Sequence, residues 1–142
     1  MTEQLTKIQS WLNDNELDVA YFSDFHSIAY LTGFESDPIE RVLALVVFPQ
    51  DEPFIFAPAL EVEAVKGAGW THPVYGYQDH EQPYQMIANY IKQHTTHATN
   101  WAVEKAQMTL DRAALLQTAV PEAKFVADLS PLMTEMHLIK TD

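Results

Sequence analysis

The five-residue segment from Asp37 to Arg41 contains three charged side chains, those of Asp37, Glu40 and Arg41. The planar guanidinium group of an arginine presents a fork of N–H donors that matches the two oxygens of a carboxylate. The segment directly precedes an apolar run that predicts a buried strand, and a rigid strand would hold Glu40 and Arg41 in place. Two interpretations follow: a binding site for a charged ligand, or a local ion pair that closes the loop.

The other polar clusters lack the spacing that catalysis or metal binding requires. His94 and His97 are three residues apart, whereas the paired histidines of a zinc protease helix are about four apart with a glutamate between them. We interpret them as residues near a helix C-terminus, where they interact favourably with the helix dipole. Asp79, His80 and Glu81 are adjacent and diverge, which indicates a solvated loop or part of a binding surface. We therefore predict no catalytic residue and no metal ligand in this chain.

Short apolar segments alternate between strand and helix patterns along the whole chain. The expected strands are Val19–Phe22, Val42–Phe48, Phe54–Ala57, Pro73–Tyr77, Trp101–Val103 and Phe125–Ala127. The expected helices are Thr2–Asn15, a short helix ended by Gly33, Leu60–Lys66, one opened by Pro83, one capped by Thr109 that carries Leu110, Ala113, Ala114 and Leu116, and Leu132–Leu138. The turn Pro49–Pro53 predicts an antiparallel hairpin. This order predicts a single α/β domain with a mixed six-stranded sheet and helices on both faces.

Composition excludes several classes of function. The 142 residues suit one domain, and a net charge of −12 disfavours binding to nucleic acid or to an anionic membrane surface. The sequence has no cysteine, which excludes a disulfide, a thiolate metal site and a cysteine nucleophile, and fits a cytoplasmic location. The N-terminal residues do not resemble a signal peptide. The longest apolar run, Val42–Phe48, is far shorter than a membrane span.

Two segments resemble the signature of the N-terminal domain shared by creatinases, prolidases and aminopeptidases P. In that family an apolar strand, here Asp18–Phe22, precedes a short helix that ends in Tyr-Leu-Thr-Gly-Phe, and Tyr30–Phe34 matches all five letters. The tail Leu138–Asp142 is similar to the junction that leads into the family's catalytic domain, with Thr141 and Asp142 as caps for a following helix. The loop 33–41 most resembles that of bacterial Xaa-Pro dipeptidases.

The resemblance implies that residues 1–142 are a creatinase/prolidase-type N-terminal domain that is inactive alone and lacks the C-terminal pita-bread metallopeptidase domain. Two divalent metal ions (Mn, Co or Zn) are implied for that missing domain and none for this chain. The implied partners are the chain's own catalytic domain and a second subunit in a homodimer. In that dimer the loop would reach the partner's active site, where Asp37, Glu40 and Arg41 would bind an Xaa-Pro dipeptide substrate.

Two alternatives remain open from the sequence. The chain is either part of a longer enzyme or a stand-alone α/β module that binds a small molecule or a protein. Within the first interpretation, an aminopeptidase P or a creatinase is an alternative parent protein. A following helix with metal-ligand motifs beyond residue 142 would favour the enzyme, and a stop codon there would favour the module.

Overall fold

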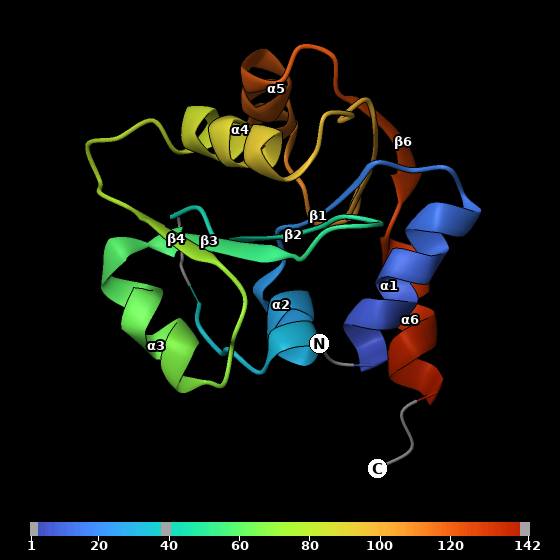
Figure 1. Cartoon of the computed structure of the whole chain (residues 1–142), viewed down its shortest axis with the longest axis horizontal. Coiled ribbons are helices and arrows are strands. Elements are labelled where there is room, and N and C mark those ends of the chain that lie inside the picture. Colours follow the sequence, from blue (N-terminus) through green and yellow to red (C-terminus); the bar gives the residue numbers. More distant parts are fainter. Residues whose placement is uncertain (1–2, 38–40, 140–142) are drawn as a thin grey trace.

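Six strands form one mixed sheet in the order β4-β3-β2-β1-β5-β6 in the computed structural model, which describes residues 3–37 and 41–139 (Figure 1). The strands are β1 (Val19–Phe22), β2 (Ala44–Val47), β3 (Phe54–Pro58), β4 (Val74–Tyr77), β5 (Asn100–Val103) and β6 (Lys124–Asp128). Strand β2 is antiparallel to β1 and β3, whereas the pairs β1–β5, β5–β6 and β3–β4 are parallel. The predicted mixed six-stranded sheet is confirmed.

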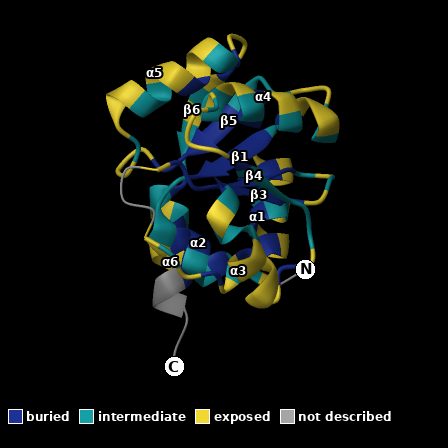
Figure 2. Cartoon of the chain, turned by 90° about the vertical axis from the view of Figure 1, so that its left-hand side faces the viewer, coloured by how far each residue is buried: buried dark blue, intermediate teal, exposed yellow. Residues whose placement is uncertain are grey.

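Helices cover both faces of this sheet. They are α1 (Glu3–Asp14), α2 (Phe25–Thr32), α3 (Val62–Gly67), α4 (Pro83–His94), α5 (Leu110–Ala119) and α6 (Ser130–Ile139), with a 3₁₀ turn, η1 (Ala59–Glu61), before α3. Helices α1, α2, α3 and α6 pack on one face, and α4 and α5 pack on the other (Figure 1). Figure 2 shows buried strands between helices whose outer surfaces are exposed. None of the helices in the described residues is long and apolar enough to cross a membrane.

The position of β2 inside the sheet, with a core on each face, explains why its sequence is continuously apolar. Leu45 and Val47 belong to the core beneath α1, α2, α3 and α6, whereas Ala44 and Val46 belong to the core beneath α4 and α5. All four side chains have no exposed surface. Because successive side chains of a strand point to opposite faces, a central strand needs apolar residues at every position.

Helix α2 begins and ends at the residues that the sequence indicated. The Asp24 side chain accepts a hydrogen bond from the backbone N–H of His26, which satisfies one of the free donors of the first turn. Gly33 ends the helix in the left-handed conformation, with φ of 81°, and its N–H donates to the Ala29 carbonyl. This glycine turns the chain out of α2 into the loop that carries Asp37 and Arg41.

Helix α5 begins at the predicted cap Thr109, but only some of its apolar residues are buried. Leu116 is fully buried, but Leu110 is 90% exposed and Ala114 is also exposed. The helix packs mainly against α4 and does not lie flat on the sheet, so that one narrow stripe is enough to bury it. The predicted cap Thr2 and the predicted junction residues Lys140–Asp142 lie outside the described residues.

The direction of the strands gathers the loops of interest at one edge. Because β1, β3, β4, β5 and β6 are parallel to one another, their carboxyl ends lie along the same edge of the sheet. Strand β2 runs the other way, so the chain enters it at this edge, just after Arg41. In α/β sheets the carboxyl edge of the strands is where ligands usually bind.

Candidate functional site

The Tyr30–Phe34 motif anchors the start of the candidate loop. Thr32 Oγ1 donates to the Ile28 carbonyl at 2.7 Å and accepts the backbone N–H of Phe34 at 3.1 Å. The Phe34 ring is 3% exposed and belongs to the core beneath α2. The motif therefore has a structural function, which is to end α2 and fix where the loop leaves it.

Arg41 lies at the other end of the loop and forms an ion pair with Asp79. Arg41 Nη2 lies 3.1 Å from Asp79 Oδ2, and the two side chains are 42% and 72% exposed. Asp79 follows β4, so the guanidinium group is paired with a carboxylate of another segment. An exposed pair of this kind contributes only about 0.2–1 kcal/mol, so another carboxylate can replace Asp79 at little cost.

Tyr77, the last residue of β4, holds the backbone directly after Arg41. Its hydroxyl accepts the backbone N–H of Val42 at 2.7 Å and donates to the Val42 carbonyl at 3.0 Å. Burial raises the pKa of the Tyr77 hydroxyl, so it remains protonated and able to donate at neutral pH. Strand β4 and the residues directly after it therefore contact both the backbone and the side chain at the exit of the loop.

The loop also borders a small hollow. Ser36 Oγ donates to Glu61 Oε1 at 3.1 Å, which links the loop to η1. A cavity of about 340 Å³ lies beside it, lined by Phe25, His26, Ala29, Glu35, Ser36 and Asp37. Leu60, next to Glu61, is 86% exposed. The hollow and the charged side chains of Glu35 and Asp37 together form a concave polar surface beside the loop.

The structure describes two of the three predicted binding residues, Asp37 and Arg41. Arg41 and Asp37 are exposed at the two ends of the segment 38–40, and Asp37 lines the hollow. Glu40 lies outside the described residues. The binding role of all three stays a prediction. The sequence placed Tyr77 at the end of an expected strand but gave no reason to link it to the loop. It indicated Asp79 only as part of the Asp79–Glu81 triplet, with no connection to Arg41.

A buried carboxylate, Glu104, forms a second polar centre at the same edge of the sheet. It directly follows β5 and is 2% exposed. Glu104 Oε1 accepts the backbone N–H groups of Ser23 and Asp24 at 2.9 and 3.0 Å, and Oε2 accepts the Ser27 hydroxyl at 2.5 Å. Burial raises the pKa of Glu104, although these hydrogen bonds act in the opposite direction.

The buried position of Glu104 makes it a structural residue of the turn from β1 into α2. Its carboxylate satisfies two backbone donors that no strand partner reaches at that point. The sequence signal was a charged residue directly after a buried apolar strand, and sequence reasoning did not use it.

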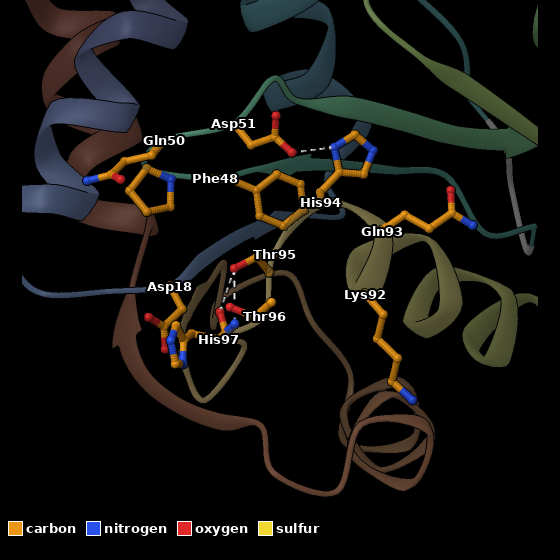
Figure 3. A pocket seen from close by; sticks show the side chains of 11 residues that line it. Asp18, Phe48, Gln50, Asp51, Lys92, Gln93, His94, Thr95, Thr96 and His97 are labelled. Atoms are coloured by element: carbon orange, nitrogen blue, oxygen red, sulfur yellow. Dashed lines mark hydrogen bonds and ion pairs between the residues drawn. The ribbon is translucent and has the colours of Figure 1, made fainter.

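His94 lies at the end of α4, beside a cavity that it lines together with His97. Its side chain is 8% exposed, with Nδ1 3.0 Å from Asp51 Oδ2 and Nε2 3.1 Å from the Tyr75 hydroxyl. The ring stacks on Phe48 with centroids 5.2 Å apart. Figure 3 shows His94 directed at Asp51, whereas His97 lies on the opposite side of this cavity of about 560 Å³. Interpreting both histidines as helix-end residues alone was incomplete, because His94 joins α4 to the β2–β3 turn.

These polar groups do not combine into a metal centre. Within residues 3–37 and 41–139, no three histidine, aspartate or glutamate side chains are grouped so that they could hold a metal ion. His94 has one carboxylate neighbour, and Glu104 is surrounded by backbone N–H and hydroxyl groups. The described residues therefore offer no site that fits a pair of divalent metal ions.

Comparisons with known proteins agree on one family. The model of the Creatinase/Prolidase N-terminal domain matches residues 4–139. The chain is 43% identical to the Xaa-Pro dipeptidase of Lactobacillus delbrueckii subsp. lactis over 97% of this chain and 38% of that protein. It is 40% identical to the Xaa-Pro dipeptidase of Lactobacillus helveticus over 96% of this chain and 37% of that protein. It therefore spans less than two fifths of the length of these curated relatives.

A solved structure gives the same result for the fold. The N-terminal domain of Xaa-Pro dipeptidase from Lactobacillus brevis superposes with a TM-score of 0.88 at 47% sequence identity. The match covers 94% of this chain and 99% of that one. The six-stranded sheet and its helices are therefore shared along nearly the whole length of both chains.

Proposed function

Because this chain belongs to the Creatinase/Prolidase N-terminal domain family, we propose that it is the non-catalytic N-terminal domain of a proline-specific metallopeptidase, an Xaa-Pro dipeptidase. Its relatives with that name are more than twice as long, which leaves room for a catalytic domain after the segment matched here. In the proposed enzyme, that domain holds two divalent metal ions (Mn, Co or Zn), and this chain supplies none of their ligands. The cytoplasmic location expected from the sequence stays a prediction.

We propose further that the domain mediates a homodimer and completes the active site of the second subunit. The observation that carries this proposal is the position of Arg41. Its guanidinium group is partly exposed at the carboxyl edge of the sheet and is already paired with a carboxylate, that of Asp79. A dipeptide has a carboxylate close to the bond that is cut, whereas in a longer peptide that group lies further away. Pairing with Arg41 would therefore favour dipeptides.

Hydrolysis of Leu-Pro is the first test of the proposed function. We expect the purified chain to show no turnover, with or without added Mn²⁺ or Co²⁺, because its described residues form no metal site. A protein in which the chain is followed by its catalytic domain is expected to hydrolyse Leu-Pro with added metal. Metal-dependent turnover that scales with the concentration of the chain alone would contradict the proposal.

Replacement of Arg41 tests the role in substrate selection. In the longer enzyme, Arg41→Ala is expected to raise KM for Leu-Pro about tenfold, the loss that one charge-assisted hydrogen bond produces, with little change in kcat. Lys66→Ala is the matched control, because it also removes an exposed cation that pairs with a carboxylate, that of Glu63, but on α3. Unchanged kinetics in both Arg41→Ala and Asp37→Ala would exclude this role.

A further inference from the structure

The ring of Tyr77 is held by packing in the core that does not depend on its contact with the loop. Its ring is 5% exposed and stacks on the fully buried ring of Phe56, with centroids 4.9 Å apart and an angle of 2° between the planes. Phe56 lies in β3, beside β4 in the sheet. Because both rings are held by the core beneath α4 and α5, the Tyr77 hydroxyl has a defined position at the edge of the sheet.

This hydroxyl binds the backbone just before β2, where pairing with β3 has not yet begun. The pairing of β2 with β3 begins at Ala44, which is opposite Phe56, so Val42 lies before the first paired residue. Val42 is nevertheless 8% exposed, and its N–H and C=O both bond to the Tyr77 hydroxyl. One side chain thus replaces the missing strand partner for both polar groups of Val42.

Arg41 precedes Val42 and is held by the same strand end. The hydroxyl of Tyr77 fixes the next peptide unit, and the carboxylate of Asp79, two residues after Tyr77, pairs with the guanidinium group at 3.1 Å. The backbone contact is buried and the side-chain contact is exposed. Tyr77 therefore makes the more durable of the two contacts, because buried hydrogen bonds are not screened by solvent.

We propose that Tyr77 is a positioning residue, whose hydroxyl holds the backbone at Val42 and so places the Arg41 guanidinium group for substrate binding. This inference rests on the proposed function of Arg41. Tyr77 acts through Arg41 and does not itself contact substrate. Its removal should therefore change KM and leave the chemical step unchanged.

The first part of the test compares two hydroxyl deletions in β4 of the purified chain. Tyr77→Phe keeps the ring on Phe56, and Tyr75→Phe removes a hydroxyl that contacts His94 instead. Amide exchange at Val42, measured by NMR, is expected to be about tenfold faster in Tyr77→Phe, because one buried hydrogen bond is lost. We expect no change at Val42 in Tyr75→Phe. Unchanged exchange in Tyr77→Phe would overturn the inference.

The second part measures Leu-Pro kinetics in the longer enzyme for Tyr77→Phe, Arg41→Ala and the double variant. Tyr77→Phe is expected to raise KM about fivefold with kcat unchanged, and the double variant is expected to match Arg41→Ala, because both changes affect one interaction. If Arg41→Ala leaves KM unchanged, the proposed role of Arg41 in substrate binding fails, and the positioning role of Tyr77 fails with it. If Arg41→Ala raises KM but Tyr77→Phe has no effect, or adds its effect in the double variant, only the positioning role fails.

Discussion

Replacement of Glu104 by alanine is expected to lower the free energy of unfolding by about 3 kcal/mol, the order of magnitude for losing hydrogen bonds to a buried charged acceptor. The carboxylate accepts the N–H groups of Ser23 and Asp24 and the hydroxyl of Ser27, and Glu104 is only 2% exposed. In Glu104→Ala, these donors lose their acceptor, and a cavity forms where the side chain was. Urea unfolding followed by circular dichroism measures the change.

Glu104→Gln separates the hydrogen bonds from the charge. The amide oxygen can still accept both backbone N–H groups, and the amide nitrogen can donate to Ser27 Oγ, whose own hydrogen can turn towards Asp24 Oδ2, 3.5 Å away. We therefore expect Glu104→Gln to be within about 1 kcal/mol of the unmodified chain at pH 7. If alanine and glutamine cost the same stability, the hydrogen-bond explanation is wrong.

The raised pKa of Glu104 predicts how the stability difference between the unmodified chain and Glu104→Gln depends on pH. Burial lifts this pKa above its usual value of 4.5, so the folded chain binds the proton more tightly than the unfolded chain does. The stability that the folded chain gains from binding this proton more tightly is complete below the usual pKa of 4.5. It is lost as the pH rises through the raised pKa. We therefore expect the chain to lose stability relative to Glu104→Gln as the pH rises above 4.5 and through the raised pKa. A stability difference that does not change with pH would contradict the raised pKa.

Local sequence patterns predicted the elements well because their causes are local. The apolar run Val19–Phe22 is β1 residue for residue, and Gly33 ends α2 as expected from its tolerance of positive φ. Helix α5 shows the limit of this reasoning. Leu110, Leu115 and Leu116 are all apolar residues of this helix, but its placement against α4 decides which leucine is buried.

The contacts that build the candidate site connect residues far apart in the sequence. Tyr77 and Val42 are separated by 35 positions, and Glu104 and Ser27 by 77. Periodicity does not say which strands are neighbours, so it gave no reason to place β4 beside the exit of the loop. The charged loop itself was found because its residues are adjacent in sequence, whereas the residues that hold Arg41 were not recognisable until the strand order was known.

Replacement of His94 by alanine is expected to lower the free energy of unfolding by about 3 kcal/mol, within the range for removing a large buried ring. The imidazole packs against Phe48 and Phe54, each with ring centroids 5.2 Å away, so its removal opens a space between α4 and the hairpin. It also bonds to Asp51 and Tyr75, which places one ring at the junction of the β2–β3 turn, β4 and α4. Thermal and urea unfolding measure the loss.

Two further variants divide this loss into its parts. His94→Phe keeps an aromatic ring against Phe48 but removes both polar contacts, and we expect it to cost about 1–2 kcal/mol, because the Tyr75 hydroxyl loses its partner. His97→Ala removes an exposed imidazole from the same cavity, and surface substitutions of this kind usually change stability by less than about 0.5 kcal/mol. Equal losses for His94→Ala and His97→Ala would mean that burial does not distinguish the two histidines. Since only His94 connects α4 to the β2–β3 turn, we expect most of the loss to appear in His94→Ala.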